Sequence, residues 1–109
     1  MKKTNILKYQ LVVTIVLSGY VERVLEANKK AGCVGGTVIK GRELSNIIPS
    51  KVLGFNIEPE REIVLNVVRE EQCKRVMEII TESVGIKTEA KGICLSLPIE
   101  DIVGISDFE

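Results

Sequence analysis

The stretch EIVLNVVREEQCKRVMEIITESVG, residues 62–85, changes its hydrophobic period partway along. Residues 63–68 are rich in β-branched side chains and too few for an ordinary helix, so they predict a strand. The following apolar residues recur at spacings of three and four, which predicts an amphipathic helix. They are Cys73, Val76, Met77, Ile80 and Val84. Two glutamates suit the start of this helix, and Gly85 is expected to end it in a left-handed conformation.

The N-terminal part of the chain shows the same order of strand and helix. Residues 10–17 are apolar on both faces, and we expect a strand that is buried on both. Ser18 is the expected N-cap of a helix that runs to about Ala31, and Gly32 the expected stop. The inner stripe of this helix would comprise Val21, Val24, Leu25, Asn28 and Ala31. Residues 36–40 predict the second strand.

The segment at about 41–59 has no sustained period, and we interpret it as a long loop with room for a short hairpin within it. Loops of this length in small domains tend to be functional or mobile. Residues 92–97 predict the fourth strand and residues 98–101 the beginning of a turn. Val103 and Ile105 are candidates for a short final strand.

This order of elements predicts an α+β, ferredoxin-like βαβ-βαβ sandwich, a four-stranded antiparallel sheet with two helices on one face. The length of 109 residues fits a single domain, 1–109. The first, third and fourth strands carry apolar side chains on both faces, so the face without helices needs a cover. We favour an oligomer over a monomer whose tail and long loop fold across the sheet.

Composition excludes several classes of function. Fifteen basic and fifteen acidic residues balance, which argues against nucleic acid as a partner. The apolar run at residues 11–17 is far shorter than the ~20 residues of a membrane span, so we expect no membrane insertion. Three widely spaced cysteines fit reduced thiols in a cytoplasmic protein. Histidine is absent, and no spacing suggests a metal site, a catalytic residue or an enzyme.

Four segments resemble the nitrogen regulatory PII family over residues 11–105. They are VVTIVLSGYVERVLEANKKAG at 12–32, GGTV at 35–38, VVREEQCKRVMEII at 67–80 and GICLSLPIEDIVGI at 92–105. The last segment is similar to the family pattern GKxFVxPVExVxRI. Their order and spacing together, rather than any single motif, carry the resemblance.

The resemblance implies a PII-like signal-transduction protein, a homotrimer whose sheets face inward. Clefts between subunits would bind a small effector, an adenine nucleotide such as ATP, ADP, AMP or cyclic AMP, with no required cofactor. The implied effector-binding residues are Ile15, Gly35, Gly36, Thr37, Val67 and Gly92, with Lys91 as a substitute cation. The long loop would regulate a partner protein, for instance a transporter or an enzyme, through Lys40, Arg42 and Glu43.

Some positions depart from the family pattern. Ile93 takes the place of the lysine in the phosphate loop, and Gly104 and Ser106 take the places of two arginines. Each lost charge-assisted contact is worth on the order of 1.5–3 kcal/mol. We therefore expect ATP not to bind tightly in the usual mode. The substitute cations would be Lys87, Lys91, Lys40 or Arg42.

The long loop is shorter than in typical members of the family and contains no tyrosine, so control by uridylylation is not expected. An alternative to the sensor is a trimeric structural or interaction module of the same fold that has lost nucleotide binding.

Overall fold

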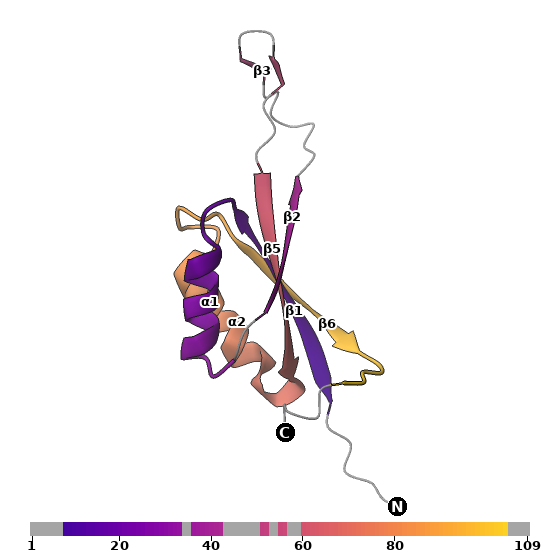
Figure 1. Cartoon of the computed structure of the whole chain (residues 1–109). Coiled ribbons are helices and arrows are strands. Elements are labelled where there is room, and N and C mark those ends of the chain that lie inside the picture. Colours follow the sequence, from indigo (N-terminus) through magenta and orange to yellow (C-terminus); the bar gives the residue numbers. More distant parts are fainter. Residues whose placement is uncertain (1–7, 34–35, 43–50, 53–54, 57–59, 105–109) are drawn as a thin grey trace, which may run out of the picture.

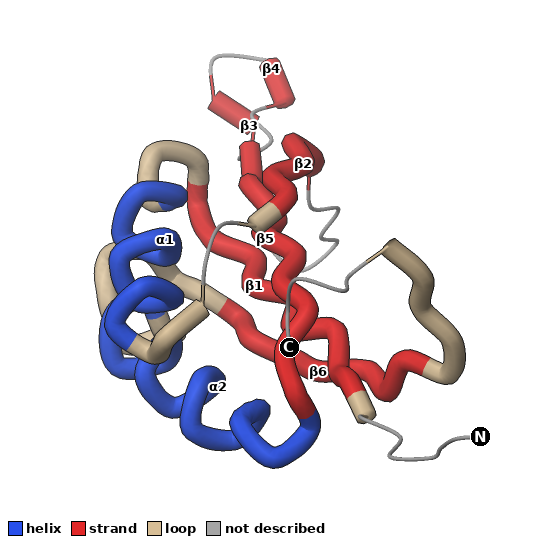
Figure 2. Tube along the Cα trace, turned by 60° about the horizontal axis from the view of Figure 1, so that its bottom comes forward, coloured by secondary structure: helices blue, strands red, loops and turns tan. Residues whose placement is uncertain are grey.

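The computed structural model describes residues 8–33, 36–42, 51–52, 55–56 and 60–104. The elements in chain order are β1 (Tyr9–Leu17), α1 (Val21–Lys30), β2 (Thr37–Arg42), β3 (Lys51–Val52), β4 (Phe55–Asn56), β5 (Glu60–Arg69), α2 (Glu70–Val84) and β6 (Ile93–Ile99). The main sheet has the order β2-β5-β1-β6, with antiparallel neighbours throughout. Both helices cover one face of this sheet (Figures 1 and 2). The predicted ferredoxin-like α+β fold is confirmed.

The core lies between this face and the two helices. Val12 and Val16 of β1 and Val64 of β5 are completely buried there, because alternate residues of a strand point to the same face. α2 packs with the stripe that the sequence predicted, although Met77 is only partly buried. The backbone N–H of Glu70 donates to the carbonyl of Lys8 at 2.9 Å, which joins the start of α2 to the start of β1.

Two predicted helix ends are wrong. α1 begins at Val21, and no side chain caps it. Ser18 instead belongs to the preceding turn, where its N–H donates to the carbonyl of Glu60 at 3.1 Å. Gly85 has a φ of −63° and a ψ of −178°, which is not left-handed. A side chain there would place its Cβ 2.5 Å from the carbonyl oxygen of Thr81, so close packing requires the glycine.

The expected stop of α1 is confirmed, since Gly32 has a φ of +93°.

The expected turn at residues 98–101 is wrong at its start, because β6 continues through Pro98 to Ile99. Pro98 lies opposite Gln10, on the strand at the sheet edge, where a missing N–H is tolerated. Val103 is 93% exposed and belongs to no strand, while Ile105 lies outside the described residues.

Part of the expected loop at about 41–59 is strand. β2 extends to Arg42, and β3 pairs with β4 as the short antiparallel hairpin that this interpretation allowed within the loop. β5 begins at Glu60, directly after the expected loop. The remaining residues of this segment, 43–50, 53–54 and 57–59, lie outside the described part.

The face of the sheet opposite the helices has no helix over it in the described part of the chain (Figure 2). This open face is apolar. Its side chains come from all four strands: Leu11, Val13, Ile15 and Leu17, Ile63, Leu65 and Val67, Ile93, Leu95 and Leu97, and Ile39. Ile39, Ile93 and Leu97 are 45–47% exposed. β1 was expected to be buried on both faces, yet in the single chain its residues on this open face are only half-buried.

Candidate functional site

Three of the predicted effector residues, Gly36, Thr37 and Val67, line one pocket of about 730 Å³. We call it the β5-edge pocket. Its lining comprises Gly32, Cys33, Gly36, Thr37, Leu65, Asn66, Val67, Val68, Arg69 and Gln72. Gly35, the fourth residue implied near this position, lies outside the described residues.

The pocket forms because β2 is shorter than the strand beside it. The ladder between β2 and β5 ends where Thr37 pairs with Leu65. From Asn66 to Arg69, β5 continues beside β1 but has no other described strand along its opposite edge. The end of α1 lies beside this free edge, because Gly32 and Cys33 line the pocket. The N–H of Cys33 donates to the carbonyl of Asn28 at 2.8 Å.

Gly36 is required in this pocket by close packing. A Cβ at this position would lie 2.9 Å from Nδ2 of Asn66 and 3.3 Å from the carbonyl oxygen of Leu65. Glycine therefore lets the backbone approach β5 more closely than any other residue could. One wall of the pocket is consequently main chain rather than side chain.

The lining combines an apolar wall with a few polar groups. Leu65, Val67 and Val68 supply the apolar surface, while Thr37 and Gln72 offer hydrogen-bonding groups. Burial raises the pKa of the Cys33 thiol, and the charge of Arg75 partly offsets this effect. A pocket of this kind suits a small ligand with an apolar body and a few polar groups.

The structure does not bring Ile15, Lys91 and Gly92 to this pocket. Ile15 lies on the open face, between Ile63 of β5 and Ile93 of β6. Lys91 and Gly92 directly precede β6, the strand at the other edge of the sheet. Three strand spacings of about 4.8 Å separate the two edge strands, roughly 14 Å in all.

The connection that contains Lys91 and Gly92 is tightly hydrogen-bonded. The N–H of Gly92 donates to the carbonyl of Val84 at 2.7 Å, and a Cβ at Gly92 would collide with that same oxygen. The Thr88 hydroxyl donates to the carbonyl of Gly85 at 2.7 Å. Lys91 adopts a positive φ of 52° and leaves its side chain exposed.

The predicted partner-loop residues Lys40 and Arg42 lie together at the far end of β2. Lys40 is opposite Glu62 and Arg42 is opposite Glu60, so charges of opposite sign face each other across the two strands. Glu62 also accepts a hydrogen bond from the N–H of Gly19 at 2.9 Å. Glu43 lies outside the described residues.

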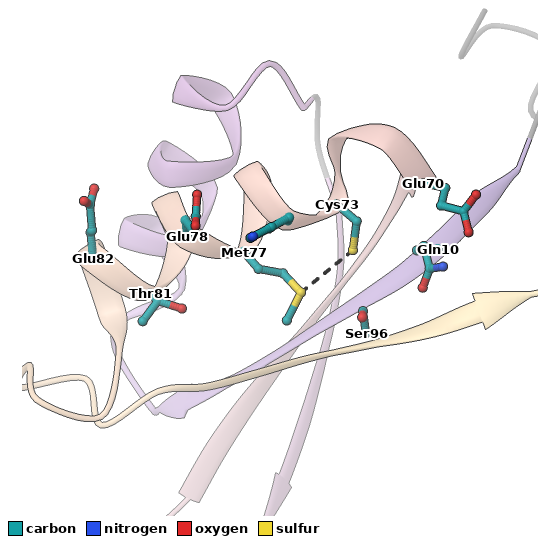
Figure 3. A pocket seen from close by; sticks show the side chains of 9 residues that line it. Gln10, Glu70, Cys73, Met77, Glu78, Thr81, Glu82 and Ser96 are labelled. Carbon is teal, nitrogen blue, oxygen red and sulfur yellow. Dashed lines mark hydrogen bonds between the residues drawn. The ribbon is translucent and has the colours of Figure 1, made fainter.

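A second hollow lies between α2 and the strands β1 and β6 (Figure 3). Cys73, Met77 and Thr81 of α2 line it together with Gln10 and Ser96 of the strands. The Sγ of Cys73 is 3.8 Å from the Sδ of Met77. Three glutamates and one lysine also line it, namely Glu70, Glu78, Glu82 and Lys74. None of the residues predicted from the sequence to bind an effector lies here.

Sequence reasoning missed the polar members of the β5-edge pocket, Asn66, Arg69 and Gln72. Asn66 offered a signal, because it interrupts the apolar run IVLNVV and buried amides need a hydrogen-bonding partner. Arg69 and Gln72 offered none, since they occupy ordinary positions at a strand end and on an exposed helix turn.

In the described part of the chain, neither helix is long and apolar enough to cross a membrane.

The sheet order and the two helices define a ferredoxin-like α+β protein. Among solved structures of this class, the chain is similar to PII from Arabidopsis thaliana in its crystal structure bound to citrate. The match has a TM-score of 0.66 at 22% sequence identity, and it covers 94% of this chain and 84% of that one. No family model and no curated protein matches the sequence. The structural likeness shows that the chain has the PII fold.

Proposed function

We propose that the protein is a single-domain, cytoplasmic PII-like signalling protein and not an enzyme. A homotrimer binds a small effector, an adenine nucleotide, in the clefts between subunits. Occupancy of the clefts changes the position of the segment at about 41–59, which regulates a partner protein such as a transporter or an enzyme. Such a change requires the effector to bind one state of the segment better than another.

The main support for this proposal is that the effector residues implied by the resemblance lie at two opposite edges of the sheet. Gly36 and Thr37 belong to the β2 edge, whereas Lys91 and Gly92 belong to the β6 edge. Since the sheet holds these edges apart, one chain cannot close a site around a single ligand. Edges of two copies can do so, and the open apolar face supports an assembly in which copies meet.

The cation positions favour an effector with few phosphates. Ile93 is 47% exposed at the start of β6, so an apolar side chain occupies the position where the family has a lysine. Gly104 contributes no side chain, and Ser106 lies outside the described residues. With Lys91 as the substitute cation, AMP, cyclic AMP and ADP should bind better than ATP. Citrate in the Arabidopsis protein supports a small anionic ligand for this fold.

Lys40, Arg42 and Glu43 are the proposed contacts with the partner protein. Lys40 and Arg42 are exposed at the end of the β2–β5 ladder from which the segment at about 41–59 departs. A partner would therefore meet these cations directly beside the segment whose position the effector controls.

Calorimetric titration with ATP, ADP, AMP and cyclic AMP tests the effector site. We expect saturable binding of about one ligand per subunit, weakened several-fold in Thr37→Ala because one hydrogen bond contributes about 1 kcal/mol. Thr81→Ala, in the hollow beside α2, is the matched control and should bind as the wild type does. A folded trimer that binds none of the four would contradict the proposal and favour the module that has lost nucleotide binding.

A further inference from the structure

Two buried asparagines join α1 to β5 beneath the β5-edge pocket. Asn28 of α1 is 1% exposed and Asn66 of β5 is 4% exposed. The Nδ2 of Asn28 donates to Oδ1 of Asn66 at 2.7 Å. Their neighbours in the same layer are apolar, with Val64 and Val68 on β5 and Ala27 on α1.

Packing alone does not explain this pair. Apolar side chains of similar size would fill the same volume without burying amide groups. The Oδ1 of Asn28 is buried and has no hydrogen-bond partner among the described residues. An unpartnered buried oxygen lowers the stability of the folded protein. The contribution of the pair to stability therefore does not explain its presence.

Each asparagine contacts a described residue that lines the pocket, Asn28 through Cys33 and Asn66 through Gly36. The main-chain carbonyl of Asn28 accepts the N–H of Cys33 at 2.8 Å, which holds Cys33 at the end of α1. The side-chain nitrogen of Asn66 lies directly against Gly36, so close that a Cβ there would be 2.9 Å away. Thr37, the next residue, begins β2.

We propose that Asn28 and Asn66 are positioning residues for the effector pocket. The side chain of Asn28 fixes the amide of Asn66, and that amide sets the height of Gly36 and Thr37 above β5. The pair thereby holds the main-chain wall and the Thr37 hydroxyl in the geometry that the effector meets. This role rests on the proposed function, because it concerns the affinity of that same site.

The test replaces both amides with apolar groups, in the double variant Asn28→Leu/Asn66→Leu. Thermal unfolding should show a stability close to that of the wild type, since neither amide of the Asn28–Asn66 hydrogen bond remains buried without the other. The affinity for the best-bound adenine nucleotide should nevertheless fall tenfold or more. Adding Thr37→Ala to the double variant should then cost little further affinity, although Thr37→Ala alone weakens binding in the wild type.

Thr14→Val is the matched control for the loss of a buried polar group. Thr14 is 0% exposed, lies on β1 with its Oγ1 3.7 Å from the Sγ of Cys94, and does not line the pocket. This variant should keep the affinity of the wild type. An unchanged affinity in the folded double variant would overturn the proposal, as would full additivity with Thr37→Ala.

A second measurement does not depend on nucleotide binding. The NMR order parameters of the Gly36 and Thr37 amides should be about 0.85 in the wild type and in Thr14→Val, and fall toward about 0.6 in the double variant. If no nucleotide binds to the wild type, the proposed function fails while this measurement still tests the positioning role. Unchanged order parameters would overturn that role. If the double variant does not fold, Asn28→Ala serves in the same comparisons.

Discussion

Lys91 adopts a φ of 52°, the only positive φ of a residue other than glycine in the described part of the chain. Such a conformation costs an L-residue on the order of 1 kcal/mol or more. Two backbone hydrogen bonds hold this part of the connection: the N–H of Gly92 donates to the carbonyl of Val84 at 2.7 Å, and the N–H of Lys91 donates to the carbonyl of Thr88 at 3.2 Å. Lys91 therefore has a backbone conformation that is strained for lysine but favourable for glycine, at a position that the resemblance implies binds an anion.

Replacement of Lys91 by glycine should raise stability. Relief of the strained φ outweighs the extra backbone entropy of glycine, and we expect a gain of about 0.5–1 kcal/mol in denaturant unfolding. Nucleotide affinity should fall in the same variant if the ammonium group is a ligand contact. Lys87→Gly, in the same connection but without a positive φ, is the control and should lose a similar amount of stability. A destabilised Lys91→Gly would refute the strain argument.

The Cys94 thiol predicts a decline of stability in alkaline solution. Burial raises its pKa above the ordinary value of 9.0, the hydrogen bond with Thr14 lowers it and Cys73 raises it further. From pH 9 upward the unfolded chain loses a proton that the folded chain retains, so stability falls as the pH rises. Cys94→Ala should be less stable than the wild type at pH 7 but show a smaller decline between pH 9 and 10.5. If urea unfolding showed that the wild type and Cys94→Ala lose equal stability over this pH range, Cys94 would not be the cause of the decline.

The sequence defined some residues better than others. The pattern in residues 62–85 identified Val76 and Ile80 as core because burial follows directly from helical periodicity. It could not distinguish a left-handed glycine from one required by close packing, and Gly85 proved to be the second kind. The Asn28–Asn66 contact was equally inaccessible, because it joins residues 38 positions apart.

α2 gains most of its stability from one buried stripe, and two adjacent isoleucines allow a direct comparison. Ile80 is completely buried, whereas Ile79 is only partly buried. Ile80→Ala should therefore cost about 2–5 kcal/mol of the free energy of unfolding. Ile79→Ala should cost about 1 kcal/mol, in proportion to the smaller apolar area that it buries. Equal losses in denaturant unfolding would show that the packing of α2 is assigned incorrectly.

Element boundaries departed from expectation where tertiary contacts override local preference. Ser18 has the chemistry of an N-cap, yet its backbone bonds to Glu60 and the helix begins three residues later. Pro98 usually ends a strand, but β6 is an edge strand and continues through it. Both outcomes depend on neighbours from distant parts of the chain, which local propensity does not include.

At the scale of the whole molecule, the candidate site could be predicted only in pieces. The sequence implied Gly36, Thr37 and Val67 together, and the structure places them in one pocket. It also implied Lys91 and Gly92, which the sheet order separates from that pocket. Under the proposed function, a site divided in this way would make effector binding depend on association of the chains, so assembly is the property that most constrains that proposal.

The open face of the sheet provides the test of assembly. Val13 lies at its centre, in a row with Leu65 of β5 and Leu95 of β6. Val13→Asp would place a charge among apolar neighbours in an interface between copies, which is strongly unfavourable. Light scattering should therefore find three 12.0 kDa chains per particle in the wild type and single chains in Val13→Asp. Glu78→Lys, on the exposed surface of α2, should leave the trimer intact. A wild type that is stable as a monomer would contradict both the assembly and the divided site, because the β2 and β6 edges would then never meet.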